Sequence, residues 1–488
     1  MSAEEKQGSK VLQHGAIYAV GSMLSRLGGF LLLPLYLKAL SPVEYGVLEM
    51  FYAISSVLAL LVSGGLSQAA LRFYYEYDEA GERKAVISTA LLAALAFSGL
   101  GALLLWPFSP QASYLLVGTP DYATSFQLVL LTLIVQMANE VGLSYLRVKG
   151  YLWRFVVASS SLLVMQVIVN LYTVVTLRWG VPGVLLGNLM GATLGCLIVT
   201  AVTLKDCGLH FRRPVLTRML HYTWPMVVAG IAGVFMDRAD RFILERWLGL
   251  EAVGIYGLAE KLATIFVMGF LRPFELAYGV HRFAIIKSAD RAEQQARAFR
   301  HYLFSAVMVG LLIVVFAPSA LHLIAGPAYW TAVLLLPILM LRYIVIGTEY
   351  IFHTGILYAG RTKFSMGIHL TNGGVRLAFT VAFIGLLGIQ APAFGALAGS
   401  FCAAIAALLI SRRFDPVKWN LSLALRVGLL GAACFFANKL AGEGWLSASA
   451  AVLAYVLGGF ALGIITRSDL ERAMALVSRY VPVRARRK

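Results

Sequence analysis

Apolar runs as long as a membrane-spanning helix recur along the whole chain and constrain its fold more than any other feature. One helical crossing of a bilayer needs about 20 mostly apolar residues. Such runs lie at 14–37, 44–68, 85–106, 122–146, 155–177, 182–204, 219–243, 252–276, 301–325, 331–357, 364–387, 392–411, 422–440 and 446–466. They lack the alternating pattern of membrane barrels. The sequence therefore predicts an all-α polytopic membrane protein with about fourteen transmembrane helices.

The basic residues indicate how these helices are oriented. The net charge is +17, which by itself would also suit a nucleic-acid-binding protein. If the N-terminus is cytoplasmic, most Lys and Arg outside the spans fall on the cytoplasmic side, as the positive-inside rule requires. The opposite side carries only Lys38, Arg178, Arg238, Arg241, Arg246 and Lys439. We expect a multi-pass protein of the bacterial inner membrane with both termini cytoplasmic, membrane lipids as partners and no nucleic acid.

Motifs for catalysis, nucleotide binding or metal binding are missing from the sequence. We find no P-loop, no Gly-rich dinucleotide fingerprint and no HExxH motif. The cysteines are scattered, so neither disulfides nor a metal site are implied; they are Cys196, Cys207, Cys402 and Cys434. We expect no enzyme, no catalytic residues, no metal and no cofactor. Uphill work would then come from a gradient of H⁺ or Na⁺, or from consumption of product.

An internal repeat divides the chain. The stretch 40–47, LSPVEYGV, parallels 248–255, LGLEAVGI, and GVLLG at 183–187 parallels GALAG at 395–399. Glu140 and Glu349 correspond at nearly the same offset. Six crossings return a chain to its starting side, so the halves are expected to be parallel repeats. We predict an N-lobe at 1–210, a C-lobe at 211–415, and two appended helices with a basic tail at 416–488.

Charged residues inside the spans are the candidate site residues, because each costs roughly 2.5–3.5 kcal/mol near the bilayer centre. Central cations without a matching acid at the same depth favour an anionic substrate such as a diphosphate. We predict that Arg26, Lys261, Arg342, Arg376 and Arg272 bind the substrate. Buried carboxylates are the usual binding groups for coupling ions. We predict that the coupling ion binds at Glu140, Glu349 and Glu260. The alternative is that these charges form structural ion pairs, for instance Arg272 with Glu275 one turn away.

Three stretches carry a family resemblance. They are SMLSRLGGF at 22–30, GGLSQAALRFYYE at 64–76 and GIYGLAEKL at 254–262. The chain resembles the polysaccharide transporter branch of the multidrug/oligosaccharidyl-lipid/polysaccharide exporter superfamily, which includes O-antigen and exopolysaccharide-unit flippases. The resemblance implies a V-shaped, two-lobed transporter of undecaprenyl-diphosphate-linked oligosaccharides that works by alternating access through a cationic central cavity.

The same resemblance assigns individual residues. Arg26 matches the basic residue of the family's Ser-Arg motif, and Glu260-Lys261 matches an acidic-basic pair of lipid II flippases, with Lys in place of the more usual Arg. The second arginine of lipid II flippases has no counterpart near Leu60, which favours a different substrate. A polymerase and glycosyltransferases of a polysaccharide pathway are the expected protein partners.

Two other functions stay open at this stage. The first is an ion-coupled multidrug or organic-cation antiporter of the same superfamily, for which an acidic cavity is expected. The second is a non-transporting assembly subunit of a polysaccharide synthesis complex, in which the buried charges would have no transport role. The central cations favour the flippase.

Overall fold

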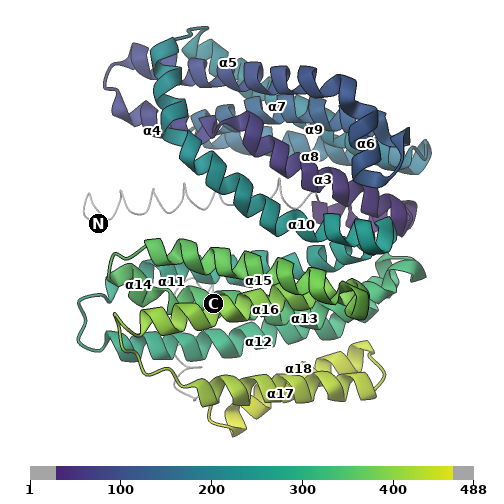
Figure 1. The fold of residues 1–488 in the computed structure, drawn as a ribbon, viewed down its shortest axis with the longest axis vertical. Coiled ribbons are helices and arrows are strands. Elements are labelled where there is room, and N and C mark those ends of the chain that lie inside the picture. The colour runs from purple at the N-terminus through teal and green to yellow at the C-terminus, as the bar shows by residue number, and fades with distance from the viewer. Residues whose placement is uncertain (1–28, 465–488) are drawn as a thin grey trace, which may run out of the picture. The chain divides into compact units, whose positions relative to one another are not determined.

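The computed structural model describes residues 29–464, which form helices joined by short non-helical segments and contain no strand (Figure 1). The helices are α2 Leu33–Ala39, α3 Pro42–Ser63, α4 Leu66–Glu76, α5 Ala80–Leu105, α6 Ser109–Val117, α7 Ala123–Val148, α8 Leu152–Asn170, α9 Gly180–Cys207, α10 Arg213–Phe266, α11 Arg272–Ala284, α12 Arg291–Ile324, α13 Leu336–Phe352, α14 Thr354–Tyr358, α15 Lys363–Leu387, α16 Ala391–Ser411, α17 Leu421–Leu440 and α18 Trp445–Ala461. The predicted all-α class is confirmed.

Ten ranges within residues 29–464 are long and apolar enough to cross a membrane, and two shorter apolar helices lie at Gly29–Ala39 and Trp445–Ala461. Five of the ten ranges contain more than one α-helix. Arg213–Ala284 is interrupted at Gly249, where φ is 81°, and Lys363–Ser411 holds both α15 and α16. The count of fourteen spans and the repeat layout stay predictions.

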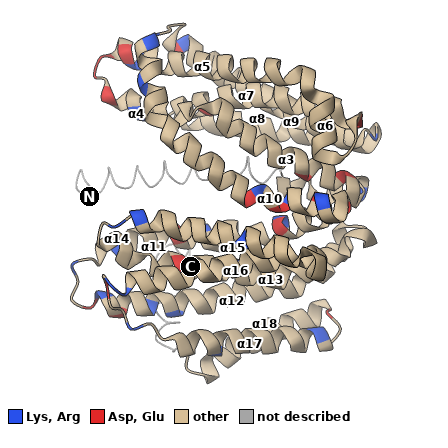
Figure 2. Ribbon diagram, viewed as in Figure 1, with Lys and Arg blue, Asp and Glu red and all other residues tan. Residues whose placement is uncertain are grey.

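Backbone contacts divide the chain into two compact units. The boundary along the chain falls within α10, between Ile255 and Tyr256. Unit 1 contains α2 to α9 and most of α10, and unit 2 contains the end of α10 and α11 to α18. In unit 1 charged residues gather where α4 ends and α5 begins, and others lie along α10, as Figure 2 shows. The predicted boundaries at 210 and 415 remain a prediction.

Local sequence explains where the first long helix of unit 1 begins. Ser41 caps α3: its hydroxyl accepts from the Glu44 amide at 3.2 Å, and the Glu44 carboxylate accepts from the Ser41 amide at 2.8 Å. Pro42 occupies the first helical turn, where its missing N–H costs nothing. This reciprocal capping box fixes the start of α3.

Two glycines allow α3 and α10 to cross at backbone contact within unit 1. A Cβ atom on Gly46 would overlap the Leu250 carbonyl, and one on Gly254 would overlap the Pro42 carbonyl. Gly46 and Gly254 are matched positions of the predicted repeat. Small residues at such crossings are typical of membrane helix packing.

We expect Gly46→Ala to lower stability by about 1–3 kcal/mol, because the added methyl group meets backbone atoms that cannot rotate away. The measurement is the thermal melting of the purified full-length protein in detergent. Gly233→Ala is the matched control, since Gly233 also lies on α10 in unit 1 and a Cβ there meets nothing within 4 Å. Equal melting temperatures for the two variants would contradict the proposed close crossing.

The segment that follows α9 is held against α5. The Ser88 hydroxyl donates to the Gly208 carbonyl at 2.9 Å, and Thr89 accepts from the Arg212 amide at 3.0 Å. Arg212 also pairs with Glu82 on α5 at 3.0 Å. The start of α10 is therefore anchored to the rest of unit 1.

In unit 2, α15 and α16 form a closely packed antiparallel pair (Figure 1). Cβ atoms on Gly395 and Gly399 would collide with α15, at the Arg376 carbonyl and the Asn372 carbonyl. The last two helices, α17 and α18, pack on α12, where the Tyr455 hydroxyl donates to the Phe304 carbonyl at 3.2 Å. The glycines of α16 thus bring it close to the backbone around Arg376.

Candidate functional site

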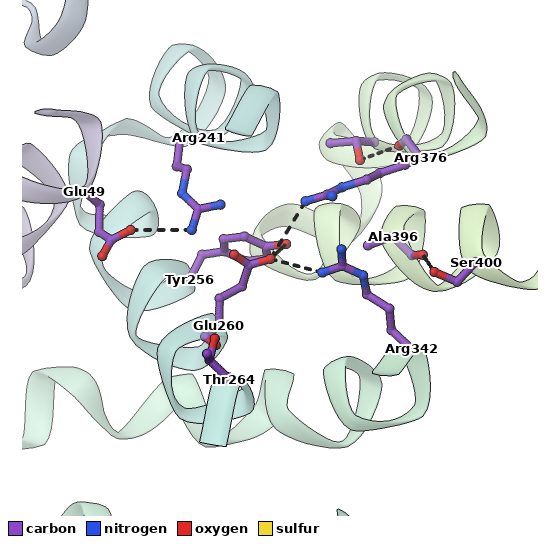
Figure 3. A network of polar contacts seen from close by, with 10 residues as sticks. Glu49, Arg241, Tyr256, Glu260, Thr264, Arg342, Arg376, Ala396 and Ser400 are labelled. Atoms are coloured by element: carbon purple, nitrogen blue, oxygen red, sulfur yellow. Dashed lines mark hydrogen bonds and ion pairs between the residues drawn. The ribbon is translucent and has the colours of Figure 1, made fainter. Parts of the chain in front are cut away.

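A carboxylate flanked by two arginines lies inside unit 2 (Figure 3). Glu260 comes from the end of α10, Arg342 from α13 and Arg376 from α15. One oxygen of Glu260, Oε1, lies 3.2 Å from Nη1 of Arg342 and 3.8 Å from Nη2 of Arg376. The side chains are 14%, 12% and 3% exposed respectively. We call these three residues the arginine–glutamate cluster.

Neighbouring residues on the same helices hold the cluster in place. The Tyr256 hydroxyl, one turn before Glu260, donates to Oε1 at 3.4 Å. One turn after it, the Thr264 hydroxyl donates to the Glu260 carbonyl at 2.9 Å, and on α15 the Thr380 hydroxyl donates to the Arg376 carbonyl at 2.8 Å. These bonds use the helical i, i+4 spacing, so they follow from local sequence.

Within the cluster, two positive charges face one negative charge. Arg342 Nε is buried and has no hydrogen-bond partner within the described chain, so this guanidinium has donor capacity that Glu260 does not use. Arg342 also lies 5.1 Å from the Tyr343 ring centroid. A buried guanidinium binds phosphate or carboxylate oxygens through two parallel hydrogen bonds. The cluster can therefore accept an anionic group beside Glu260.

The other predicted substrate-binding residues lie elsewhere. Arg26 falls outside the described residues. Lys261 is half-buried next to Glu260. Arg272 is 69% exposed and pairs with Glu275 at 2.8 Å, which is the structural ion pair that helical spacing suggested. The structure thus groups Arg342 and Arg376 and does not bring Arg272 to them.

Two predicted ion-coupling residues have contrasting environments. Glu140 is exposed on α7 of unit 1. Glu349 is buried on α13 of unit 2, with its Oε1 3.6 Å from Nδ1 of His353. The third, Glu260, is the acid of the arginine–glutamate cluster. The central cations were expected to lack an acid at their depth, and for Arg342 and Arg376 that expectation is wrong because both lie beside Glu260.

A buried ion pair in unit 1 was not predicted from the sequence. Arg241 on α10 and Glu49 on α3 lie 3.5 Å apart, with side chains 2% and 8% exposed (Figure 3). The charge distribution had placed Arg241 among the basic residues on the side of the membrane opposite the cytoplasm. Glu49 lies inside the apolar run 44–68 and Arg241 inside the run 219–243. An ionisable residue within an apolar run is the sequence signal that could have identified this pair.

Comparison with known proteins identifies the family. The sequence profile described as "Polysaccharide biosynthesis protein" matches residues 11–278. The chain belongs to this family. The predicted resemblance to polysaccharide transporters is confirmed.

A curated relative is the succinoglycan biosynthesis transport protein ExoT of Rhizobium meliloti (strain 1021), 25% identical over 268 residues. This match covers 52% of the chain and 52% of ExoT. The chain thus aligns with only about half the length of that relative.

Solved structures give the fold. The lipid II flippase MurJ in an inward closed conformation is similar with a TM-score of 0.70 and 13% identity, covering 91% of this chain and 97% of MurJ. A multidrug resistance MATE family transporter of the MOP superfamily, in an inward-facing conformation, is similar with a TM-score of 0.64 and 17% identity, covering 81% and 95%. This family member is a multi-pass membrane protein with the fold shared by these transporters.

Proposed function

We propose that the protein is a flippase that moves an oligosaccharide linked to undecaprenyl diphosphate from the cytoplasmic to the periplasmic leaflet of the inner membrane. Family membership supports a role in polysaccharide export. The observation that carries the proposal is the pair of buried arginines around Glu260. The substrate class implied is an O-antigen, capsule or exopolysaccharide repeat unit on its lipid carrier.

Binding of the diphosphate would follow from the donor geometry. Arg342 and Arg376 share one carboxylate oxygen, and the buried Nε of Arg342 has no hydrogen-bond partner among the described residues. A diphosphate brings several oxygens and more negative charge than one carboxylate, so it competes well for both guanidinium groups. After the diphosphate is released, Glu260 would again form ion pairs with the two arginines. This competition limits how tightly the diphosphate binds. Arg26 and Lys261 would add positive charge.

The predicted organisation fits this role. We propose fourteen spans in two parallel six-helix repeats with two appended helices, both termini cytoplasmic, and alternating access between leaflets. In this scheme the protein is no enzyme, and a polymerase and glycosyltransferases act before and after it. An ion gradient of H⁺ or Na⁺, coupled through Glu349, Glu260 or Glu140, would supply energy.

Deletion of the gene is expected to leave lipid-linked oligosaccharide in the cytoplasmic leaflet and to stop its delivery to the periplasm. The measurement is the labelling of the lipid-linked sugar by a membrane-impermeant reagent in spheroplasts. Expression of the full-length protein should restore labelling. Unchanged periplasmic delivery in the deletion strain would rule out the flippase.

The alternatives make different predictions. An organic-cation antiporter would need an acidic binding site, whereas the arginine–glutamate cluster has more arginines than carboxylates. An assembly subunit would tolerate single substitutions at Arg342 and Arg376 with normal export.

A further inference from the structure

A second group of ionisable side chains lies in unit 2, about two helical turns along α13 and α15 from Arg342 and Arg376. Glu349 and His353 are one turn apart at the end of α13 and are 6% and 8% exposed. Glu349 Oε1 lies 3.6 Å from His353 Nδ1. The His353 ring lies 6.0 Å from the ring of His369 on α15, with 17° between the ring planes. His369 is exposed.

The buried Glu349–His353 pair has few other polar neighbours. Among the described residues, His353 is the one side chain placed within ion-pair distance of Glu349, and His353 Nε2 is buried without a hydrogen-bond partner. Burial penalises net charge. With one proton the pair is neutral overall, and without it the pair carries a negative charge. A proton is therefore favoured when the pair is sealed from water.

Other ionisable groups approach from the packed helices. Arg282 on α11 is buried, and its guanidinium lies 4.6 Å from the Tyr350 ring centroid. On α12, Arg300 and His301 follow Phe299, whose ring packs 5.4 Å from that of Phe352. α16 contains no acidic, basic or histidine residue within its bounds. The positive charge of Arg282 opposes a second proton on His353.

The chemistry of the group suits a proton better than a sodium ion. Hard cations are held by several oxygen ligands, whereas here one carboxylate faces an imidazole nitrogen. Within residues 29–464 no set of three or more His, Cys, Asp or Glu is arranged to hold a metal ion. A carboxylate and an imidazole, by contrast, are a standard pair for proton transfer.

We infer that Glu349 and His353 form a proton-binding site that exchanges with water through His369. A proton taken from water by His369 passes to His353 and then to Glu349, and it returns by the same groups. The 3.6 Å between Glu349 Oε1 and His353 Nδ1 exceeds hydrogen-bond length, and the rings of His353 and His369 lie 6.0 Å apart. Each proton transfer therefore uses a bridging water or a small side-chain movement. We further infer that this proton is the coupling ion of the transport cycle, an inference that rests on the proposed flippase function.

Proton binding is tested without substrate, using the full-length protein in lipid nanodiscs. Infrared difference spectra between acidic and alkaline pH record the C=O band of a protonated buried carboxyl group. Wild type should show the band, Glu349→Gln should lose it, and His353→Asn should shift its pH midpoint. Glu293→Gln, at an exposed position on α12, should retain it. Glu349→Asp should keep a band, and size-exclusion profiles establish that each variant is folded.

Two results would overturn the proton site. One is a band that persists in Glu349→Gln, and the other is a band that sodium alone removes at constant pH. Neither result depends on whether the protein moves a lipid.

Coupling is tested in proteoliposomes with a fluorescent undecaprenyl-diphosphate oligosaccharide. One proton per cycle converts a gradient of one pH unit into about a tenfold accumulation ratio. Wild type should respond to the pH gradient and not to a sodium gradient, while Glu349→Gln and His353→Asn should lose the response. His322→Asn, at the end of α12, should keep it. If wild type moves no lipid, the flippase proposal fails while the infrared result stands; if Glu349→Gln responds fully, the coupling role fails.

Discussion

Replacing Arg376 by Gln is expected to reduce translocation of the lipid-linked oligosaccharide at least about tenfold. Each charge-assisted hydrogen bond to an anion contributes about 1.5–3 kcal/mol, and the Arg376 side chain is buried. Arg342→Gln should have an effect of similar size, because both guanidinium groups reach the same Glu260 oxygen. The measurement is the initial rate of appearance of the sugar in the outer leaflet of proteoliposomes.

Conservative and remote substitutions separate binding from folding. Arg376→Lys keeps the charge but loses the planar fork, so its rate should fall between those of wild type and Arg376→Gln. Arg297→Gln is the control, since Arg297 is 41% exposed and pairs with Glu293 and Asp290 on the surface of unit 2. Wild-type rates for folded Arg342→Gln and Arg376→Gln would refute the role of these two arginines in binding the diphosphate.

Replacing Glu49 by Gln is expected to destabilise the protein by about 3–5 kcal/mol, because it removes the acidic charge from a buried ion pair. Arg241 is 2% exposed and lies 3.5 Å from Glu49, so water cannot solvate the remaining guanidinium. The measurement is the free energy of unfolding of the full-length protein in bicelles.

A surface ion pair in the same unit provides the comparison. Glu76→Gln removes the partner of Arg218, but both side chains are more than one-third exposed, and such pairs contribute at most about 1 kcal/mol. The double variant Glu49→Gln/Arg241→Gln should recover part of the lost stability, which gives a coupling energy above about 1 kcal/mol. A Glu49→Gln effect no larger than that of Glu76→Gln would show that the buried pair contributes little.

Features that depend on short stretches of chain were predictable from the sequence. The capping of α3 by Ser41 follows from an SPVE motif. The Arg272–Glu275 ion pair was foreseen as one alternative, since residues three apart face each other on any α-helix. Arg342 and Arg376 were selected by their depth within apolar runs, because charges there are costly enough to demand a polar environment.

Pairings between distant helices were not predictable in the same way. Glu260 reaches Arg342 across 82 residues of sequence, and Glu49 reaches Arg241 across 192. Helical periodicity fixes the face on which a residue lies, but it does not say which helix packs against that face. The ring contact between His353 and His369 was missed for the same reason, because the two histidines lie on different helices.

Long apolar runs and family motifs are local properties of the chain, so the sequence alone was enough to predict an all-helical membrane protein of this polysaccharide biosynthesis family. Only the tertiary structure decided which charges meet. Close helix crossings at Gly46, Gly254 and Gly395 set which helices touch, and buried charges then stabilise one another only across those contacts. The arginines, selected as isolated cations, thereby became a cluster organised around one carboxylate.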